Sequence, residues 1–370
     1  MRIAVVAESF LPQVNGVSNT VRHLVEELSA AGHQCMVIAP GRGCSTYAGA
    51  PVVRVRSLPL PRYREFPVGL PDPVVAQALT HFAPDVVHLA SPAVLGAAGI
   101  RAARRLGIPT VAVFQTDLAG FARQYHLRAD ALLWAWIRHL HSRTDRTLAP
   151  CTDFVEQLRR AGVPRVYRWG RGVDLDLFDP ARRDDAFRQP IAPDGEVVLG
   201  YVGRVAAEKC VRRLAEVADI PGTRLVVVGD GPERQALQQM LPGAVFTGML
   251  HGDALARTFA SLDVFVHTGA HETFCQTVQE AQASGVTAVA PAAGGPRDLI
   301  EHGRTGLLYR TDLPSALRES VATVVRDGIL RRRMSSAALA RVRGRTWART
   351  VDELVSQHYA DVLAPMEIAA

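Results

Sequence analysis

The 370-residue sequence predicts an α/β protein made of two Rossmann-like domains in series. Its length exceeds what one simple hydrophobic core organises and fits two domains of ordinary size. Short apolar strands alternate with helical segments twice, first over residues 1–172 and again over residues 173–345. Between the two alternations, residues 170–197 are rich in Asp, Pro and Gly without apolar periodicity, which is typical of a linker. We expect the last helix, within residues 346–370, to cross back onto the first domain.

The first forty residues predict the opening strand, helix and strand of a Rossmann-like domain. The strands cover Ile3–Ala7 and Gln34–Ala39, and the helix covers Ser18–Ala31 with Ser18 as its N-cap. The turn before the helix lacks the G-x-G-x-x-G fingerprint, so NAD is not the expected ligand. It does contain Gly16, where the missing side chain would let backbone N–H groups approach a phosphate or a sugar. The alternative is that Gly16 only makes a turn.

Two later segments of the first half are candidates for holding an anionic acceptor or a membrane surface. The basic, proline-rich stretch Arg54–Pro67 predicts a loop. Residues Gln115–Arg143 predict a loop followed by an amphipathic helix whose polar side carries Arg138, His139 and Arg143. A helix of this kind usually packs on its own domain, and the alternative is a role at a membrane or an acceptor.

The second half contains the stretch around which we expect the site to be built. The apolar strand Leu262–His267 leads through a polar turn into a helix that opens near Phe274 and returns as the strand Thr287–Ala290. Glu272 stands in the turn, and Glu280 lies eight positions later, roughly 12 Å along the helix axis. This separation matches the reach from a hexose across a diphosphate to a ribose, although the same spacing also occurs by chance around ordinary helices.

The start of this helix adds a second ligand-binding feature. The first backbone N–H groups, at Phe274, Cys275 and Gln276, have no partner within the helix and carry the positive end of its dipole. Hydroxyls and phosphates are both suited to such a position.

Composition narrows the function classes. The net charge of +6 favours an anionic substrate or an anionic membrane, whereas nucleic acid is disfavoured because no binding motif is present and aromatic residues make up only 6%. Five cysteines without close pairing predict reduced thiols and no zinc site. No apolar run approaches the ~20 residues of a membrane span, and the sequence starts directly with a strand, so a cytoplasmic protein is expected.

Seven motifs occur in one order along the chain: NGV (15–17), GRVAAEK (203–209), VVGDG (227–231), FTG (246–248), HETFCQTVQEAQASG (271–285), AGGPRDLI (293–300) and TGLL (305–308). Together they resemble the retaining glycosyltransferases of family 4. The resemblance implies the GT-B fold, two Rossmann-like doubly wound domains facing each other across a deep cleft. The opening AVVAESFLPQVNGVSNTV and the phrase VVHLASPA (86–93) are most similar to the actinobacterial subgroup of GDP-mannose-dependent α-mannosyltransferases that act on glycolipids.

The resemblance also implies residue roles, with an acceptor domain over 1–172 and a nucleotide-sugar donor domain over 173–345. Arg204 and Lys209, the only lysine of the sequence, would hold the diphosphate and neutralise the leaving group, so neither a metal nor another cofactor is expected. Glu272 would bind the transferred hexose and Glu280 the ribose hydroxyls, while Leu250 would lie against the base. The catalytic set implied is Arg204, Lys209, Glu272 and Asp117. The donor-binding set implied is Gly16, Gln115, Gly203, Arg204, Lys209, Gly229, Leu250, Glu272, Phe274, Cys275, Gln276 and Glu280.

Two departures from the family pattern bear on these roles. Gln115 stands where many relatives carry a histidine, and it cannot shuttle a proton; either it only binds a hydroxyl, or Asp117 assumes part of the role. Cys275 and Gln276 replace the usual glycine and leucine, which leaves the identity of the hexose open.

The expected function is metal-independent, front-side transfer of a hexose, in first place mannose from GDP-mannose, with retention of configuration. The expected acceptor is a glycolipid or another hydroxyl compound, and peripheral contact with the inner face of an anionic membrane is expected with it. One alternative is a family 4 transferase that uses a UDP-sugar (glucose, N-acetylglucosamine, glucuronic acid or sulfoquinovose) and acts on a lipid or a small natural product. An epimerase or a phosphorylase on the same scaffold is a second, and a nucleotide-sugar-binding protein without catalysis is a third.

Overall fold

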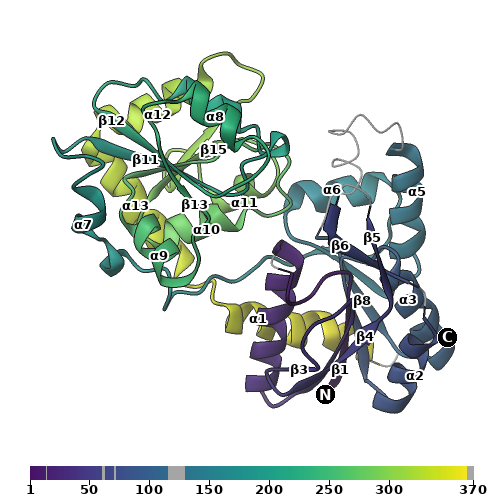
Figure 1. Ribbon diagram of the computed structural model, residues 1–370. Helices are drawn as coiled ribbons and strands as arrows, with labels where there is room; N and C mark the ends of the chain where they lie inside the picture. The colour runs from purple at the N-terminus through teal and green to yellow at the C-terminus, as the bar shows by residue number, and fades with distance from the viewer. Residues whose placement is uncertain (14, 61–62, 71, 116–129, 365–370) are drawn as a thin grey trace. The chain divides into compact units, whose positions relative to one another are not determined.

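The computed structural model describes residues 1–13, 15–60, 63–70, 72–115 and 130–364. The chain forms two compact units (Figure 1): Met1–Arg171 together with Trp347–Ala370, and Gly172–Thr346. These divisions lie one residue from the boundaries predicted at 172/173 and 345/346. Each unit contains a parallel sheet with helices packed on it, which is the predicted doubly wound α/β class.

The first unit is organised by a sheet in the order β10-β9-β8-β7-β1-β2-β4-β3, in which only the β3–β4 pair is antiparallel. Its strands are β1 (Arg2–Ala7), β2 (Gln34–Pro40), β3 (Thr46–Tyr47), β4 (Ala50–Val55), β7 (Val86–Ala90), β8 (Thr110–Val113), β9 (Arg146–Ala149) and β10 (Val166–Arg168). Its helices include α1 (Gly16–Ala30), α2 (Pro73–Phe82), α3 (Leu95–Leu106), α5 (Asp130–His141) and α6 (Thr152–Arg160). The strand order reverses between β1 and β7, so ligand-binding loops are expected where these two strands end.

The start of helix α1 differs from the prediction that Ser18 is its N-cap. Asn15 is the N-cap, and its side chain accepts hydrogen bonds from the N–H groups of Val17 and Ser18, both at 3.0 Å. Ser18 instead accepts from the Asn15 N–H at 3.0 Å, which completes a reciprocal capping box. The helix therefore begins at Gly16, one residue after the asparagine that satisfies its free amides.

The prediction that Arg54–Pro67 is a loop is also wrong. Strand β4 runs to Val55, and Ser57–Leu60 (β5) pairs antiparallel with Tyr63–Gly69 (β6). A two-stranded ribbon leaves one edge of each strand unpaired, so prolines without an N–H are tolerated there. This tolerance explains how a proline-rich segment forms a hairpin.

The C-terminal segment belongs to the first unit and is anchored on its sheet. It runs through α14 (Trp347–Glu353), a π-helical turn η4 (Leu354–Tyr359) and α15 (Ala360–Leu363). The indole N–H of Trp169 donates to the Thr350 carbonyl at 2.9 Å, and the Tyr359 hydroxyl lies 2.9 Å from Nδ1 of the buried His88. Two hydrogen bonds of buried aromatic residues therefore tie this segment to β7 and to the residue that follows β10.

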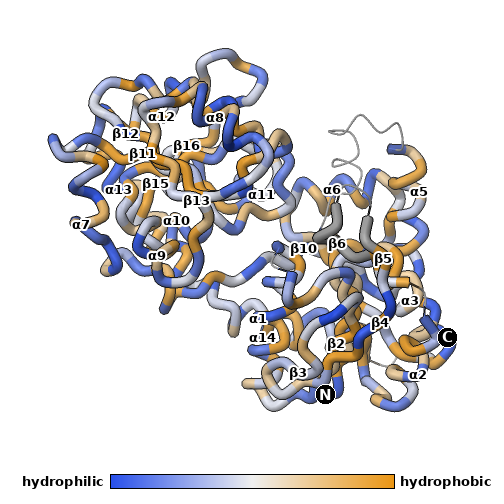
Figure 2. Tube along the Cα trace, in the orientation of Figure 1, coloured by the Kyte–Doolittle hydropathy of each residue, from blue (hydrophilic) through white to orange (hydrophobic). Residues whose placement is uncertain are grey.

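The second unit is built on a wholly parallel sheet in the order β13-β12-β11-β14-β15-β16. Its strands are β11 (Val197–Val202), β12 (Thr223–Val228), β13 (Val245–Gly248), β14 (Val264–Val266), β15 (Thr287–Pro291) and β16 (Gly306–Tyr309). Its helical segments are η1 (Pro180–Arg182), α7 (Asp185–Arg188), η2 (Ala207–Lys209), η3 (Val211–Glu216), α8 (Arg234–Met240), α9 (Gly252–Ala260), α10 (Gln276–Ala283), α11 (Gly295–Leu299), α12 (Ala316–Arg326) and α13 (Gly328–Val342). The strands are hydrophobic and lie at the centre of the unit (Figure 2), as expected for a sheet covered on both faces. The order reverses between β11 and β14.

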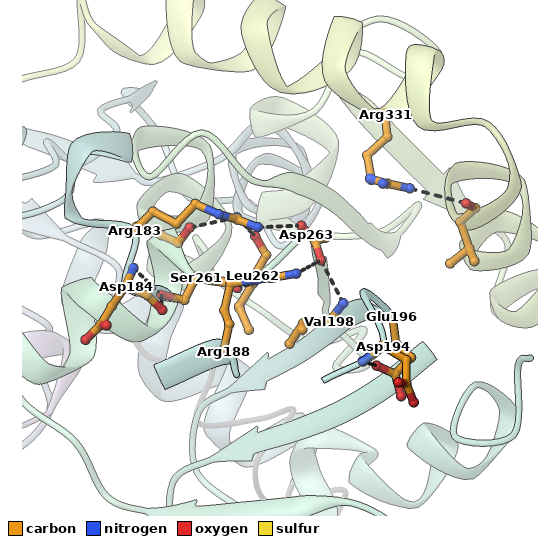
Figure 3. A network of polar contacts seen from close by, with 12 residues as sticks. Arg183, Asp184, Arg188, Asp194, Glu196, Val198, Ser261, Leu262, Asp263 and Arg331 are labelled. Atoms are coloured by element: carbon orange, nitrogen blue, oxygen red, sulfur yellow. Dashed lines mark hydrogen bonds and ion pairs between the residues drawn. The ribbon is translucent and has the colours of Figure 1, made fainter. Parts of the chain in front are cut away.

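Most of the predicted linker is packed on the second unit by a network around Asp263 (Figure 3). One oxygen of Asp263, Oδ2, accepts from Arg188 at 3.0 Å and from the Val198 N–H at 2.8 Å; its other oxygen accepts from Arg183 at 3.3 Å. The network joins the segment containing η1 and α7 to the beginnings of β11 and β14. It thereby fixes the two strands whose opposite ends carry the candidate site.

Candidate active site

Two oppositely charged predicted residues meet where the strand order of the second sheet reverses. Lys209 lies in η2 after β11, and Glu272 lies in the loop after β14. The Lys209 Nζ is 2.5 Å from Glu272 Oε1, and their side chains are 28% and 15% exposed. Burial favours neutral Lys209, but Glu272 raises the pKa of Lys209 above its ordinary value. Burial likewise opposes the carboxylate, but Lys209 and His267 hold the pKa of Glu272 well below its usual range.

Arg204 lies on the same loop as Lys209. Its side chain is 45% exposed and its Nη1 lies 3.2 Å from the Glu208 carboxylate, while the buried Tyr201 hydroxyl donates to the Arg204 carbonyl at 2.9 Å. The backbone is thus fixed and the cationic end remains accessible. Each of the two predicted phosphate-binding cations is paired with a carboxylate of the protein.

The predicted glycines Gly203 and Gly229 bring neighbouring loops into backbone contact. A side chain at Gly229, where φ is +131°, would place its Cβ 2.0 Å from the Gly203 carbonyl oxygen. The Gly229 N–H donates to the Gly248 carbonyl at 2.8 Å. The loops after β11, β12 and β13 are therefore packed together at the carboxyl edge of the sheet. Leu250, predicted to contact a base, is half-buried against the hydrophobic core of this unit.

The start of α10 carries the unusual sequence Phe274-Cys275-Gln276 in an equally unusual backbone conformation. Phe274 and Cys275 are buried, and Cys275 has φ of +73°, the left-handed conformation that glycine adopts most easily. No side-chain hydrogen bond caps α10 within the described residues. The Gln276 side-chain N–H donates to the Gly172 carbonyl at 3.0 Å, so this residue also anchors the first residue of the second unit.

The preceding loop is held in place by the start of α11. The Gly295 N–H donates to the Glu272 carbonyl at 2.9 Å, and a Cβ at Gly295 would lie 1.9 Å from the Phe274 carbonyl oxygen. Only glycine allows this approach. The backbone that carries Glu272 is consequently fixed from both sides, by α11 and by the start of α10.

Glu280 lies within α10 in a very different environment from Glu272. No hydrogen bond or ion pair of its carboxylate occurs within the part of the chain that the structure describes. Burial raises the pKa of Glu280 to about 7. A buried carboxylate without a counter-ion is costly to the free protein, and such groups are common where a ligand supplies the missing partners.

The site residues predicted for the first unit gather around Arg171. Gln115 follows β8, is 5% exposed and accepts a hydrogen bond from Arg171 Nη2 at 3.4 Å. A Cβ at Gly16 would lie 3.4 Å from Arg171 Nη1, so the start of α1 reaches the same guanidinium. Asp117 lies outside the described residues. Sequence reasoning missed Arg171, since it follows a weak strand and belongs to no motif.

Glu8 fills the ligand position at the strand reversal of the first sheet. Its carboxylate, at the end of β1, accepts from the N–H groups of Ala93, Gly96 and Leu95 at 2.6, 2.8 and 3.2 Å. Burial raises the pKa of Glu8, and the amides oppose this shift. Because the first unit satisfies the start of α3 with its own carboxylate, whereas α10 has no side-chain cap, an anionic ligand is better suited to the second unit.

Two doubly wound units, the second with a lysine and a glutamate at its strand reversal, define a two-domain transferase of the GT-B type. Residues 14–177 match the family described as Glycosyltransferase Family 4, and residues 182–341 match Glycosyl transferases group 1. The chain belongs to glycosyltransferase family 4 and is a glycosyltransferase, as its motifs predicted.

Two of the relatives match this chain over all or nearly all of their length. A protein of Mycolicibacterium smegmatis named GDP-mannose-dependent alpha-mannosyltransferase is 52% identical, with 100% of both chains covered. A protein of Mycobacterium tuberculosis with the same name is 50% identical over 97% of both chains. A sulfoquinovosyl transferase of Arabidopsis thaliana is 30% identical over 97% of this chain and 73% of that protein.

Solved structures confirm the GT-B fold. A sucrose-phosphate synthase of Thermosynechococcus elongatus superposes with a TM-score of 0.80 at 18% identity, covering 98% of this chain and 99% of the other. Anabaena HepE in complex with UDP gives a TM-score of 0.78 at 18% identity, with 98% and 100% covered. At this identity the likeness concerns the fold alone. No helix within the described residues is both long and apolar enough to cross a bilayer.

Proposed function

We propose that this protein transfers mannose from GDP-mannose to a hydroxyl group of an acceptor, with retention of the α configuration. The observation that carries the proposal is the Lys209–Glu272 pair at the strand reversal of the second unit, in a chain 52% identical to a GDP-mannose-dependent alpha-mannosyltransferase over its whole length. The pair supplies a cation for a diphosphate and a carboxylate for a sugar within one ion pair.

Donor binding exchanges the partners of the two site cations. In the free protein Lys209 is paired with Glu272 and Arg204 with Glu208. A diphosphate carries more negative charge than one carboxylate, so it competes for both cations. The exchange releases Glu272 to accept hydrogen bonds from hydroxyls of the hexose, while Glu280 binds the ribose hydroxyls as their acceptor.

Transfer proceeds by front-side displacement without a metal. As the bond from the sugar to the phosphate breaks, Lys209, Arg204 and the amides at the start of α10 stabilise the negative charge that develops on GDP. The departing phosphate oxygen takes the proton of the attacking acceptor hydroxyl, and the new bond forms on the same face of the sugar. The contribution of the protein is positioning and charge stabilisation.

The proposed acceptor is a glycolipid at a membrane surface. Helix α5 exposes Leu132 and Trp136, which are 76% and 39% exposed as whole residues, beside the exposed residues Arg138 and His139. Exposed apolar and basic side chains on one helix are suited to the interface of an anionic membrane. The protein would accordingly act in the cytoplasm, peripherally bound at the inner face of the cell membrane.

The donor can be tested by thermal-shift measurements with GDP, UDP, GDP-mannose and UDP-glucose, each with and without EDTA. A ligand at 100 times its Kd stabilises a protein by about 2.7 kcal/mol, so at one common concentration the nucleotide with the lowest Kd gives the largest shift. We expect the guanine nucleotides to stabilise most, and EDTA to leave the shift unchanged. A larger thermal shift with UDP or UDP-glucose would show that the donor is a UDP-sugar. A thermal shift that requires Mg²⁺ or Mn²⁺ would contradict metal-independent binding.

A further inference from the structure

We propose that His267 is a positioning residue of the transferase, which keeps Glu272 oriented and ionised when Lys209 turns to the donor diphosphate. This inference rests on the proposed function, because it concerns what happens to Glu272 once a donor takes over its lysine partner.

His267 lies directly behind Glu272. It follows β14, is 3% exposed, and its Nε2 is 3.4 Å from Oε1 of Glu272, the same oxygen that Lys209 contacts. Within the described residues neither ring nitrogen makes a hydrogen bond of good geometry, and the polar groups that interact with the ring are Glu272 and Cys275. A buried ring whose Nε2 lies at ion-pair distance from a carboxylate, with the contact still long, can strengthen that contact when the carboxylate loses another partner.

The surroundings hold the ring in this place. It is stacked on Phe265, with ring centroids 6.3 Å apart, and the Tyr309 hydroxyl donates to the His267 carbonyl at 3.2 Å. A Cβ at Gly269 would lie 3.2 Å from His267 Nε2, 3.4 Å from Glu272 Oε1 and 3.5 Å from the Cα of Lys209. A Cβ here would be tight against His267 Nε2 and in ordinary van der Waals contact with the other two atoms, so Gly269 lies where histidine, glutamate and lysine meet.

The polar groups around the ring favour its protonated form. The Glu272 carboxylate and the Cys275 side chain face it from the loop and from the start of α10, and Lys209 faces the shared carboxylate from η2. Tyr201 and Glu208 interact with the same cluster from β11 and its following loop. Burial lowers the pKa of His267, but Cys275 and Glu272 outweigh burial and raise the pKa to about 10. The ring is therefore a cation at neutral pH.

This arrangement solves a problem that donor binding creates. When the diphosphate recruits Lys209, Glu272 would remain as a buried carboxylate that has lost its closest cation, which favours protonation or displacement. An imidazolium behind it supplies a second cation that does not touch the donor. Because His267 remains next to Glu272, Lys209 can bind the diphosphate leaving group while Glu272 stays ionised and binds the sugar.

A double-mutant cycle over His267→Gln and Glu272→Gln tests this coupling. Glutamine keeps an N–H near the position of Nε2 but removes the charge, so we expect His267→Gln to lower kcat for mannosyl transfer by about tenfold and to leave the Kd for GDP within about twofold. In the Glu272→Gln background the same change should have less than about a twofold effect. Equal loss in both backgrounds, or no loss in the wild-type background, overturns the proposal. The exposed His81→Gln is the matched control.

Unfolding measurements separate this inference from the proposed donor. If wild-type protein transfers no mannose from GDP-mannose, the proposed function fails, yet the unfolding free energies of the four proteins still measure the coupling between His267 and Glu272. Because the pKa of His267 is raised from 6.5 to about 10, its contribution is complete below pH 6.5 and lost as the pH passes 10. A coupling free energy near zero at pH 6 overturns the inference independently of any substrate.

Discussion

The Nζ of Lys209 and Oε1 of Glu272 lie 2.5 Å apart although 63 positions separate the two residues in the sequence. The contact arises because β11 and β14 are neighbours in the sheet, with Leu199 paired to Val264. Residues that follow these strands therefore emerge at one edge. In the free protein the two charges neutralise each other, and in the proposed mechanism an anionic donor separates them into two binding groups.

Lys209→Ala and Arg204→Ala should each lower kcat by on the order of 10²-fold, because each removes a charge that matters most as GDP departs. Initial rates at saturating donor measure this effect. Arg212→Ala is the control, because this arginine is 64% exposed and paired with Glu233, and its rate should stay within about twofold. If both site variants are folded and their rates are unchanged, Lys209 and Arg204 do not stabilise the leaving group.

Glu272→Gln should separate catalysis from nucleotide binding. Glu272 is proposed to contact only the hexose, so the Kd for GDP measured by calorimetry should change little while kcat falls by at least about tenfold. The value of kcat falls because the contact between Glu272 and the hexose strengthens as the sugar gains positive charge in the transition state. Loss of GDP affinity in this variant, with retention in Glu280→Gln, would mean that the donor binds in the opposite direction.

Glu280→Gln should weaken nucleotide binding and raise the stability of the free protein. Losing charged hydrogen bonds to the ribose should weaken GDP and GDP-mannose alike by roughly 1.5–3 kcal/mol. In the folded protein the pKa of Glu280 is raised from 4.5 to about 7, so the folded state binds this proton more tightly than the unfolded state. The cost of burying the carboxylate is absent below pH 4.5 and complete above pH 7.

We therefore expect Glu280→Gln to raise the free energy of unfolding at pH 8, by about 1–3 kcal/mol, and to leave it nearly unchanged at pH 4.5. Chemical denaturation at the two pH values checks this expectation. A variant that is less stable than wild type at pH 8 would show that Glu280 has a stabilising partner in the free protein.

Asp263→Ala should destabilise the second unit without touching the site. Asp263 is 16% exposed and accepts hydrogen bonds from Arg188, which is 14% exposed, and from the Val198 N–H. Removing the carboxylate leaves the poorly exposed Arg188 guanidinium without its counter-ion, which should cost about 2–4 kcal/mol of stability. Asp312→Ala is the control, since its pair with Arg310 is about two-thirds exposed on both sides and should contribute less than 1 kcal/mol. Equal unfolding midpoints for the two variants would contradict the importance of this network.

The sequence predicted the elements that depend on local periodicity. Predictions were wrong or missing where the structure depends on contacts between residues far apart in the sequence. The strands predicted over Ile3–Ala7 and Gln34–Ala39 are β1 and β2 to within one residue, and the strand-helix-strand unit around Glu272 is present, because both follow from apolar patterns within a few residues. The β5–β6 hairpin was missed since prolines normally argue against strands, and only the free edges of an isolated ribbon permit them.

The partners of the site side chains were beyond sequence reasoning for a related reason. The motifs marked Lys209 and Glu272 separately, but their mutual contact depends on sheet order. His267 ended a predicted strand and gave no sign of facing Glu272. Glu8 contacts amides 85 to 88 positions away, so its role in filling the start of α3 could not be read from its neighbours.

The central claim is α-retaining mannosyl transfer from GDP-mannose, and time-resolved proton NMR of the reaction tests it most directly. The purified protein would be incubated with GDP-mannose and octyl α-mannoside, or with a monoglycosyl diacylglycerol in detergent, in the presence of EDTA. The account predicts that the first signal of the product is that of an α-linked mannose and that it appears together with GDP. A β-linked first product, or transfer from UDP-glucose but not from GDP-mannose, would contradict it.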